Sequence, residues 1–62
     1  MSLTIDAIMT DLLKMPVGTT GTRWDVCVTR WSADRFETRT WGRRPTLSAY
    51  DAAAEIFASV RS

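Results

Sequence analysis

The chain lacks histidine, has one cysteine (Cys27) and has only two prolines among its 62 residues. A single cysteine cannot form an intrachain disulfide, and the absence of histidine excludes the common Cys/His zinc sites. A chain this short buries only about 60% of the surface that its unfolded form exposes. With neither covalent nor metal support expected, we predict that good packing or self-association stabilises the core.

Long apolar runs and a strong excess of charge are also missing. No segment approaches the roughly 18 apolar residues of a membrane-spanning helix, and no charged start followed by an apolar run indicates a signal peptide. We therefore expect a cytoplasmic protein without membrane contact, in agreement with a free cysteine. The net charge of +1 gives no global case for nucleic acid, but six of the seven arginines lie within residues 23–44.

Hydrophobic periodicity predicts one α+β domain over residues 1–62, in the order α-β-β-α, with an antiparallel β-hairpin packed against two helices. The first helix is expected over 3–15, with Thr4 as N-cap, Lys14 in its last turn and Pro16 ending it. The second helix is expected over 49–61, with Ser48 as N-cap. Strands are predicted over 23–31 and 36–41, joined by a turn at 32–35, and residues 17–22 form a loop.

The predicted turn pairs Trp31 with Phe36 and so assigns the strand residues to two faces. One face carries Trp24, Val26, Val28 and Trp41, and the other carries Cys27, Thr29, Trp31, Phe36, Thr38 and Thr40. Two helices can cover only one of these faces, and a lone hairpin leaves its edges unpaired. Exposed aromatic clusters mark interfaces, so we predict a homodimer that buries Trp31 and Phe36, with a monomer wrapped by its helices as the alternative.

Candidate catalytic groups are few. Asp51 and Glu55 share a helix face and could hold a metal or serve as an acid/base pair, or they form a solvated stripe. Cys27 could be a nucleophile, but no activating base is available, and a small apolar role fits a strand centre. The segment Gly18–Gly21 invites a phosphate-binding interpretation, but it lacks the lysine and following helix of a P-loop, so a connector is favoured. We predict no enzyme activity, no metal and no cofactor.

Arginine and tryptophan side chains concentrate on the predicted hairpin. The predicted partner-binding residues are Arg30, Trp31, Arg35, Phe36, Arg39, Arg43 and Arg44. Tryptophan and arginine are preferred anchors at protein interfaces, and the same residues can bind a nucleic-acid backbone with unstacked bases. A third interpretation places the tryptophans in the core and pairs the arginines with nearby acids. A protein partner ranks before nucleic acid, because a net charge of +1 attracts phosphate weakly.

The segment that ends in Asp51-Ala52-Ala53-Ala54-Glu55 resembles the back half of double-stranded RNA-binding domains, which carry an alanine-rich second helix after a hairpin. That family has three strands and a lysine cluster where the second helix starts. Here Thr46-Leu47-Ser48 occupies that place, with Arg43 and Arg44 just upstream. No residue role is carried over from the family.

In size, missing catalytic groups and arginine-tryptophan surface, the chain resembles small phage and mobile-element inhibitors such as anti-CRISPR proteins. This resemblance is one of class and rests on no motif. The predicted function is a non-enzymatic interaction protein that docks on a bacterial protein or ribonucleoprotein. The alternative is a small nucleic-acid-binding regulator that uses the arginine-rich hairpin.

Overall fold

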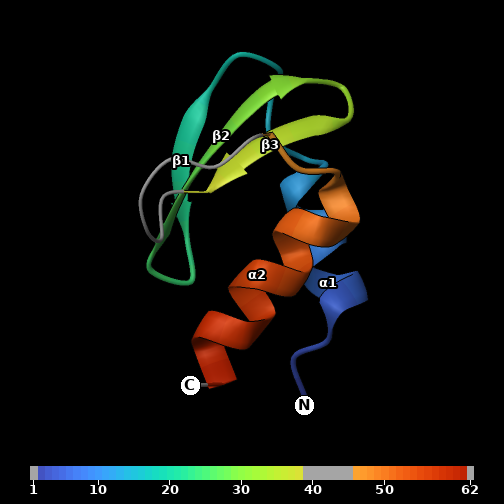
Figure 1. Cartoon of the computed structure of the whole chain (residues 1–62), viewed down its shortest axis with the longest axis vertical. Coiled ribbons are helices and arrows are strands. Elements are labelled where there is room, and N and C mark those ends of the chain that lie inside the picture. Colours follow the sequence, from blue (N-terminus) through green and yellow to red (C-terminus); the bar gives the residue numbers. More distant parts are fainter. Residues whose placement is uncertain (1, 39–45, 62) are drawn as a thin grey trace.

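The computed structural model describes residues 2–38 and 46–61. The elements are α1 (Ile5–Leu12), β1 (Thr20–Arg23), β2 (Val26–Ser32), β3 (Arg35–Thr38) and α2 (Ala49–Arg61). The strands form one antiparallel sheet in the order β1-β2-β3, and both helices lie on one side of it (Figure 1). The α+β class and the flanking helices are confirmed, and the structure adds a strand that the sequence did not predict.

Both helices have the N-caps that the sequence predicts, although α1 begins at Ile5 and not at residue 3. The Thr4 hydroxyl accepts a hydrogen bond from the Ala7 amide at 3.1 Å, and the Ser48 hydroxyl accepts one from the Asp51 amide at 3.1 Å. The prediction for the end of α1 was wrong, because Leu13 already caps the helix and Lys14 lies beyond it. The chain turns there through bonds from Lys14 and Met15 to the carbonyls of Asp11 and Leu12, before Pro16 is reached.

The loop predicted for residues 17–22 is instead a tight turn followed by β1. Gly18 has a φ of +84°, and the Thr19 amide bonds the Pro16 carbonyl at 3.3 Å, as in a turn with glycine at its third position. The Gly18 amide donates to the Arg30 carbonyl, while the Arg30 amide donates to the Thr19 carbonyl. This is a glycine β-bulge, which leads the chain directly into pairing with β2.

The turn between β1 and β2 replaces the first part of the predicted strand 23–31. Trp24 and Asp25 have φ values of +49° and +65°, and Arg23 pairs with Val26 across them. Two successive left-handed residues are typical of a two-residue hairpin turn of type I′. Trp24 is 38% exposed at this turn, so its predicted place on the core face was wrong.

A second bulge changes the register between β2 and β3. Ser32 pairs with Arg35 as the predicted turn requires, but Arg30 pairs with Phe36, so Trp31 is the extra residue of β2. A shift of one residue exchanges the faces of a strand. Phe36 and Thr38 therefore lie on the core face, opposite to their predicted positions.

One hydrophobic core lies between the helices and the inner face of the sheet. Its buried members are Ile8, Leu12, Met15, Val26, Val28, Phe36, Ala52, Ala53 and Ile56. The alanines let α2 approach closely, and Phe36 is the largest fully buried side chain. The outer face carries the alternate strand residues Thr20, Thr22, Cys27, Thr29 and Glu37.

Candidate interaction surface

Arg30 has a structural role that the sequence did not reveal. Its Nη1 donates to the carbonyls of Leu13 (3.1 Å) and Met15 (2.7 Å). Its Nε and Nη2 donate to the carbonyls of Ser32 (3.2 Å) and Ala33 (2.7 Å). One guanidinium therefore joins the end of α1 to the β2–β3 turn, a geometry that the planar fork of arginine suits. The Arg30 donors are thus engaged with carbonyls of the chain itself.

Phe36, another residue predicted to bind a partner, does not lie at the surface. Its side chain is fully buried, and the Arg30 guanidinium lies over its ring at 5.3 Å from the centroid. The bulge at Trp31 causes this outcome, because it moves Phe36 from the outer face to the inner face. The predicted pairing of Trp31 with Phe36, and a dimer interface that buries Phe36, are therefore wrong.

Trp31 remains at the surface and is held in one orientation. Its side chain is 58% exposed, and the indole Nε1 donates to Glu37 Oε1 at 2.8 Å. Because Glu37 lies on the outer face, this bond draws the ring onto the outer side of the sheet. An aromatic ring already held in place loses little conformational entropy when a partner covers it.

Two exposed apolar side chains that sequence reasoning missed belong to segments bonded to Arg30, at the same end of the sheet as Trp31. Leu13 is 46% exposed and Val17 is 57% exposed. The Leu13 carbonyl binds Arg30, and Val17 directly precedes Gly18, whose amide bonds the Arg30 carbonyl. Trp31 directly follows Arg30, so the backbones of Val17 and Trp31 lie at the same end of the sheet. The available signal was Val17 between a proline and a turn glycine, where a side chain points to solvent.

Basic side chains accompany these apolar ones. Lys14 lies between Leu13 and Met15, whose carbonyls bind Arg30. Arg35 is the first residue of β3, and both basic side chains are exposed. We call Leu13, Lys14, Val17, Trp31 and Arg35 the Trp31 surface. The remaining predicted arginines, Arg39, Arg43 and Arg44, lie outside the described residues, as do Thr40 and Trp41.

The other candidate groups are also placed. Glu55 accepts a hydrogen bond from the buried Thr38 hydroxyl at 3.3 Å, while Asp51 is exposed in the first turn of α2. Cys27 is half-buried on the outer face. Within residues 2–38 and 46–61, no group of three or more Cys, Asp or Glu side chains is arranged to hold a metal. Over the same residues, neither helix has the length and apolar character needed to span a membrane.

Comparison with family models, curated proteins and solved structures finds no match to this chain.

Proposed function

We propose that this protein is a non-enzymatic interaction module that docks on another protein through the Trp31 surface. The observation that carries the proposal is Arg30, whose guanidinium bonds four carbonyls at the end of α1 and the β2–β3 turn and whose own carbonyl binds the Gly18 amide. These bonds hold the backbone that carries Leu13, Val17 and Trp31 at one end of the sheet. Three exposed apolar side chains on a fixed backbone are costly in water and are stabilised when a partner covers them. An aromatic anchor surrounded by smaller contacts is typical of interface hot spots.

Charge indicates the kind of partner. Lys14 and Arg35 accompany the apolar side chains, while the Asp34 carboxylate nearby accepts a hydrogen bond from the Ser32 hydroxyl at 3.3 Å. A basic rim around an apolar centre complements an acidic protein surface with a pocket for the indole. A bacterial protein or ribonucleoprotein target fits this description, and inhibition by occupying the target's own binding site would be the simplest mechanism.

Nucleic-acid binding is the second candidate, and the third strand favours it. The order helix, three strands, helix is the one implied by the resemblance to double-stranded RNA-binding domains. Such domains recognise duplex shape and phosphates more than sequence. Two observations weigh against this candidate: the donors of Arg30 are engaged with carbonyls, and Leu13 and Val17 offer nothing to phosphate. A shared fold also does not imply a shared function.

A capture experiment with matched variants tests the proposal. The tagged protein, Val17→Ser and Val60→Ser would be compared on lysate from the source organism, and captured proteins identified. Val60 is 44% exposed near the end of α2, far along the chain from the Trp31 surface, so its substitution controls for lost apolar area. We expect one stoichiometric protein to be retained by the wild type and Val60→Ser and lost with Val17→Ser. Equal capture by all three forms would refute this surface.

Titrations in salt separate the two candidates. Binding to the purified target should change modestly between about 50 and 200 mM salt, because apolar contacts dominate it. Binding to duplex RNA through several phosphate contacts would instead fall by orders of magnitude over that range. Tight, steeply salt-dependent RNA binding that survives Val17→Ser would favour the second candidate over the first.

A further inference from the structure

The two edges of the sheet differ in how they are covered. On the free side of β3, both backbone groups of Phe36 bond Leu47: the Phe36 amide at 2.8 Å and the Phe36 carbonyl at 2.6 Å. On the free side of β1, no residue of the described ranges pairs with the strand. Unpaired strand edges are templates for pairing with another chain. Among residues 2–38 and 46–61, the edge of β1 is therefore the place where this sheet can be extended.

The hydrogen-bond pattern identifies which groups of β1 face outward. Arg30 bonds the turn before β1 through both its amide and its carbonyl. In antiparallel pairs the direction of these groups alternates along the strand, so the amides and carbonyls of Val28 and Val26 also point toward β1. The backbone groups of their partners, Gly21 and Arg23, point toward β2. The amides and carbonyls of Thr20 and Thr22 must then point away from the sheet. Both threonines are exposed.

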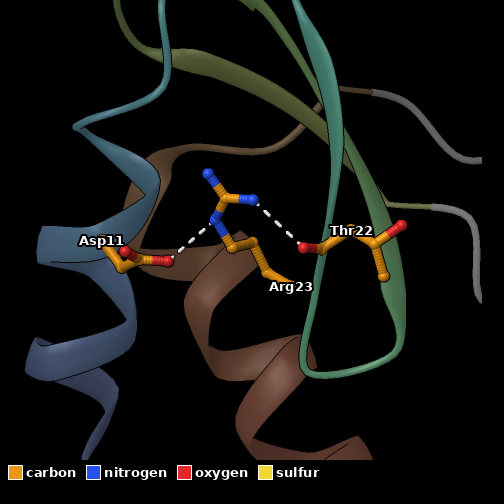
Figure 2. A network of polar contacts seen from close by, with 3 residues as sticks. All are labelled: Asp11, Thr22 and Arg23. Carbon is orange, nitrogen blue, oxygen red and sulfur yellow. Dashed lines mark hydrogen bonds and ion pairs between the residues drawn. The ribbon is translucent and has the colours of Figure 1, made fainter.

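The Arg23 side chain binds one of these outward-pointing groups, the Thr22 carbonyl. Its Nη1 donates to the Thr22 carbonyl at 3.1 Å, and its Nε pairs with Asp11 Oδ2 on α1 at 2.9 Å (Figure 2). Gly21 makes room for this arrangement, because a Cβ there would lie 3.2 Å from Arg23 Nη1. The guanidinium thus bridges α1 and β1 at the position that an added strand would need.

We propose that the edge of β1 is a self-association surface that pairs antiparallel with β1 of a second copy, and that Arg23 limits this pairing by holding the Thr22 carbonyl. A two-fold axis at Gly21 sets Thr20 of each copy opposite Thr22 of the other. Each outward amide of Thr20 and Thr22 then faces an outward carbonyl of the second copy, and each carbonyl faces an amide. The ion pair with Asp11 holds the guanidinium at the carbonyl and so supports this limit.

The sequence around Gly21 is what selects a second copy as the occupant. Thr-Gly-Thr reads the same in both directions, so antiparallel pairing matches threonine with threonine, a favourable cross-strand pair. Glycine meets glycine at the axis, which leaves space for both guanidinium groups. The Thr20 and Thr29 hydroxyls already bond at 2.9 Å on the outer face, and the added strand continues this threonine row.

Sedimentation over a concentration series tests the proposal with three forms. Arg23→Ala should tighten dimerisation about tenfold relative to wild type, because the competing charged hydrogen bond is lost. Adding Thr22→Pro to Arg23→Ala should abolish the dimer: proline removes an outward amide without breaking the β1–β2 ladder. Asp11→Asn, which frees Arg23 without deleting it, should shift the equilibrium in the same direction by a smaller factor and serves if Arg23→Ala does not fold.

Amide exchange locates the contact. In the dimer, the Thr20 and Thr22 amides should exchange more slowly than in the monomer, and Trp31→Ala should change neither exchange nor dimer affinity. Failure of both Arg23→Ala and Asp11→Asn to tighten dimerisation overturns the proposal. So does a dimer that survives Thr22→Pro, or one that depends on Trp31. Because this interface shares no residue with the Trp31 surface, its failure leaves the proposed function standing, and the reverse also holds.

Discussion

The two hairpin turns lie at opposite ends of the sheet and are held in different ways (Figure 1). At the β1–β2 turn the backbone carries the whole change of direction, with Trp24 and Asp25 both in the left-handed region. At the β2–β3 turn, which needs no left-handed residue, the Arg30 side chain bonds the Ser32 and Ala33 carbonyls. Each end exposes a tryptophan, but only Trp31 is oriented by a side-chain hydrogen bond that the structure records.

The first turn is determined by its own backbone conformation, whereas the second is also held by a tertiary contact. The first turn stores backbone strain, because left-handed φ values cost roughly 1–2 kcal/mol for residues other than glycine. The second turn is bonded by a side chain that also binds α1's end, so its stability is coupled to the helix. Substitutions at the first turn should therefore change stability by relieving or adding strain. Substitutions at the second should disconnect two elements.

The largest effect is expected for Arg30→Met. Methionine keeps the aliphatic stem but removes every donor to four carbonyls, which should lower the free energy of unfolding by about 3 kcal/mol or more. Urea unfolding followed by tryptophan fluorescence measures this loss. Arg35→Met is the matched control: it removes an exposed arginine from the same hairpin and should stay within about 0.5 kcal/mol of wild type. Equal losses for both variants would contradict the role given to Arg30.

Gly18→Ala tests the bulge opposite Arg30 and should cost about 1–2 kcal/mol. Gly18 has a φ of +84°, and nothing lies within 4 Å of an added Cβ, so the cost is conformational and not steric. For Gly21→Ala the cost is steric and not conformational, because an added Cβ would lie 3.2 Å from the movable end of the Arg23 side chain. Thermal unfolding of both variants and of Gly18→Asn should rank Asn above Ala at position 18, since asparagine tolerates the left-handed region.

Asp25→Gly should stabilise the protein by about 0.5–1 kcal/mol, because glycine is preferred at the second position of a type I′ turn. For a domain of this size, that raises the melting temperature by roughly 2–8 °C. Asp34→Gly at the other turn should bring no such gain, since Asp34 has no left-handed φ to relieve. Calorimetry that showed the same gain at both sites would remove the contrast between the two turns.

The smallest effect on stability is expected for Trp31→Ala. An indole that is 58% exposed contributes little to folding, so chemical denaturation should change by less than about 0.5 kcal/mol. Affinity for the captured partner should fall at least tenfold, as expected for an aromatic anchor. A stability loss of several kcal/mol would show that Trp31 packs as a core residue, and an unchanged affinity would exclude it as an anchor.

Local signals in the sequence were sufficient for the N-caps of both helices. Thr4 and Ser48 are N-caps recognisable by residue type, and the apolar spacing that follows each defines the buried stripe. The order of helices and the β2–β3 turn at Ala33-Asp34 followed from the same kind of evidence. These features depend on residues within about one or two helical turns of each other.

The strand β1 and the face of Phe36 could not be predicted in this way. Thr20–Arg23 contains a glycine and resembles a loop, and it becomes a strand only because β2 provides the hydrogen-bonding partner. The bulge at Trp31 leaves no mark in residue type, yet it decides whether Phe36 faces the core or solvent. Arg30 looked like a partner-binding arginine because its carbonyl acceptors at Leu13 and Met15 are distant in sequence.

The placement of the helices has a practical consequence for fusion proteins. The start of α1 and the end of α2 lie at the end of the molecule away from the β2–β3 turn (Figure 1). A fluorescent reporter or affinity handle attached at either end through a short linker would extend away from Trp31. The domain can therefore be immobilised on a sensor chip through either terminus in turn. Identical binding in both formats would show that the attachment point leaves the contact area accessible.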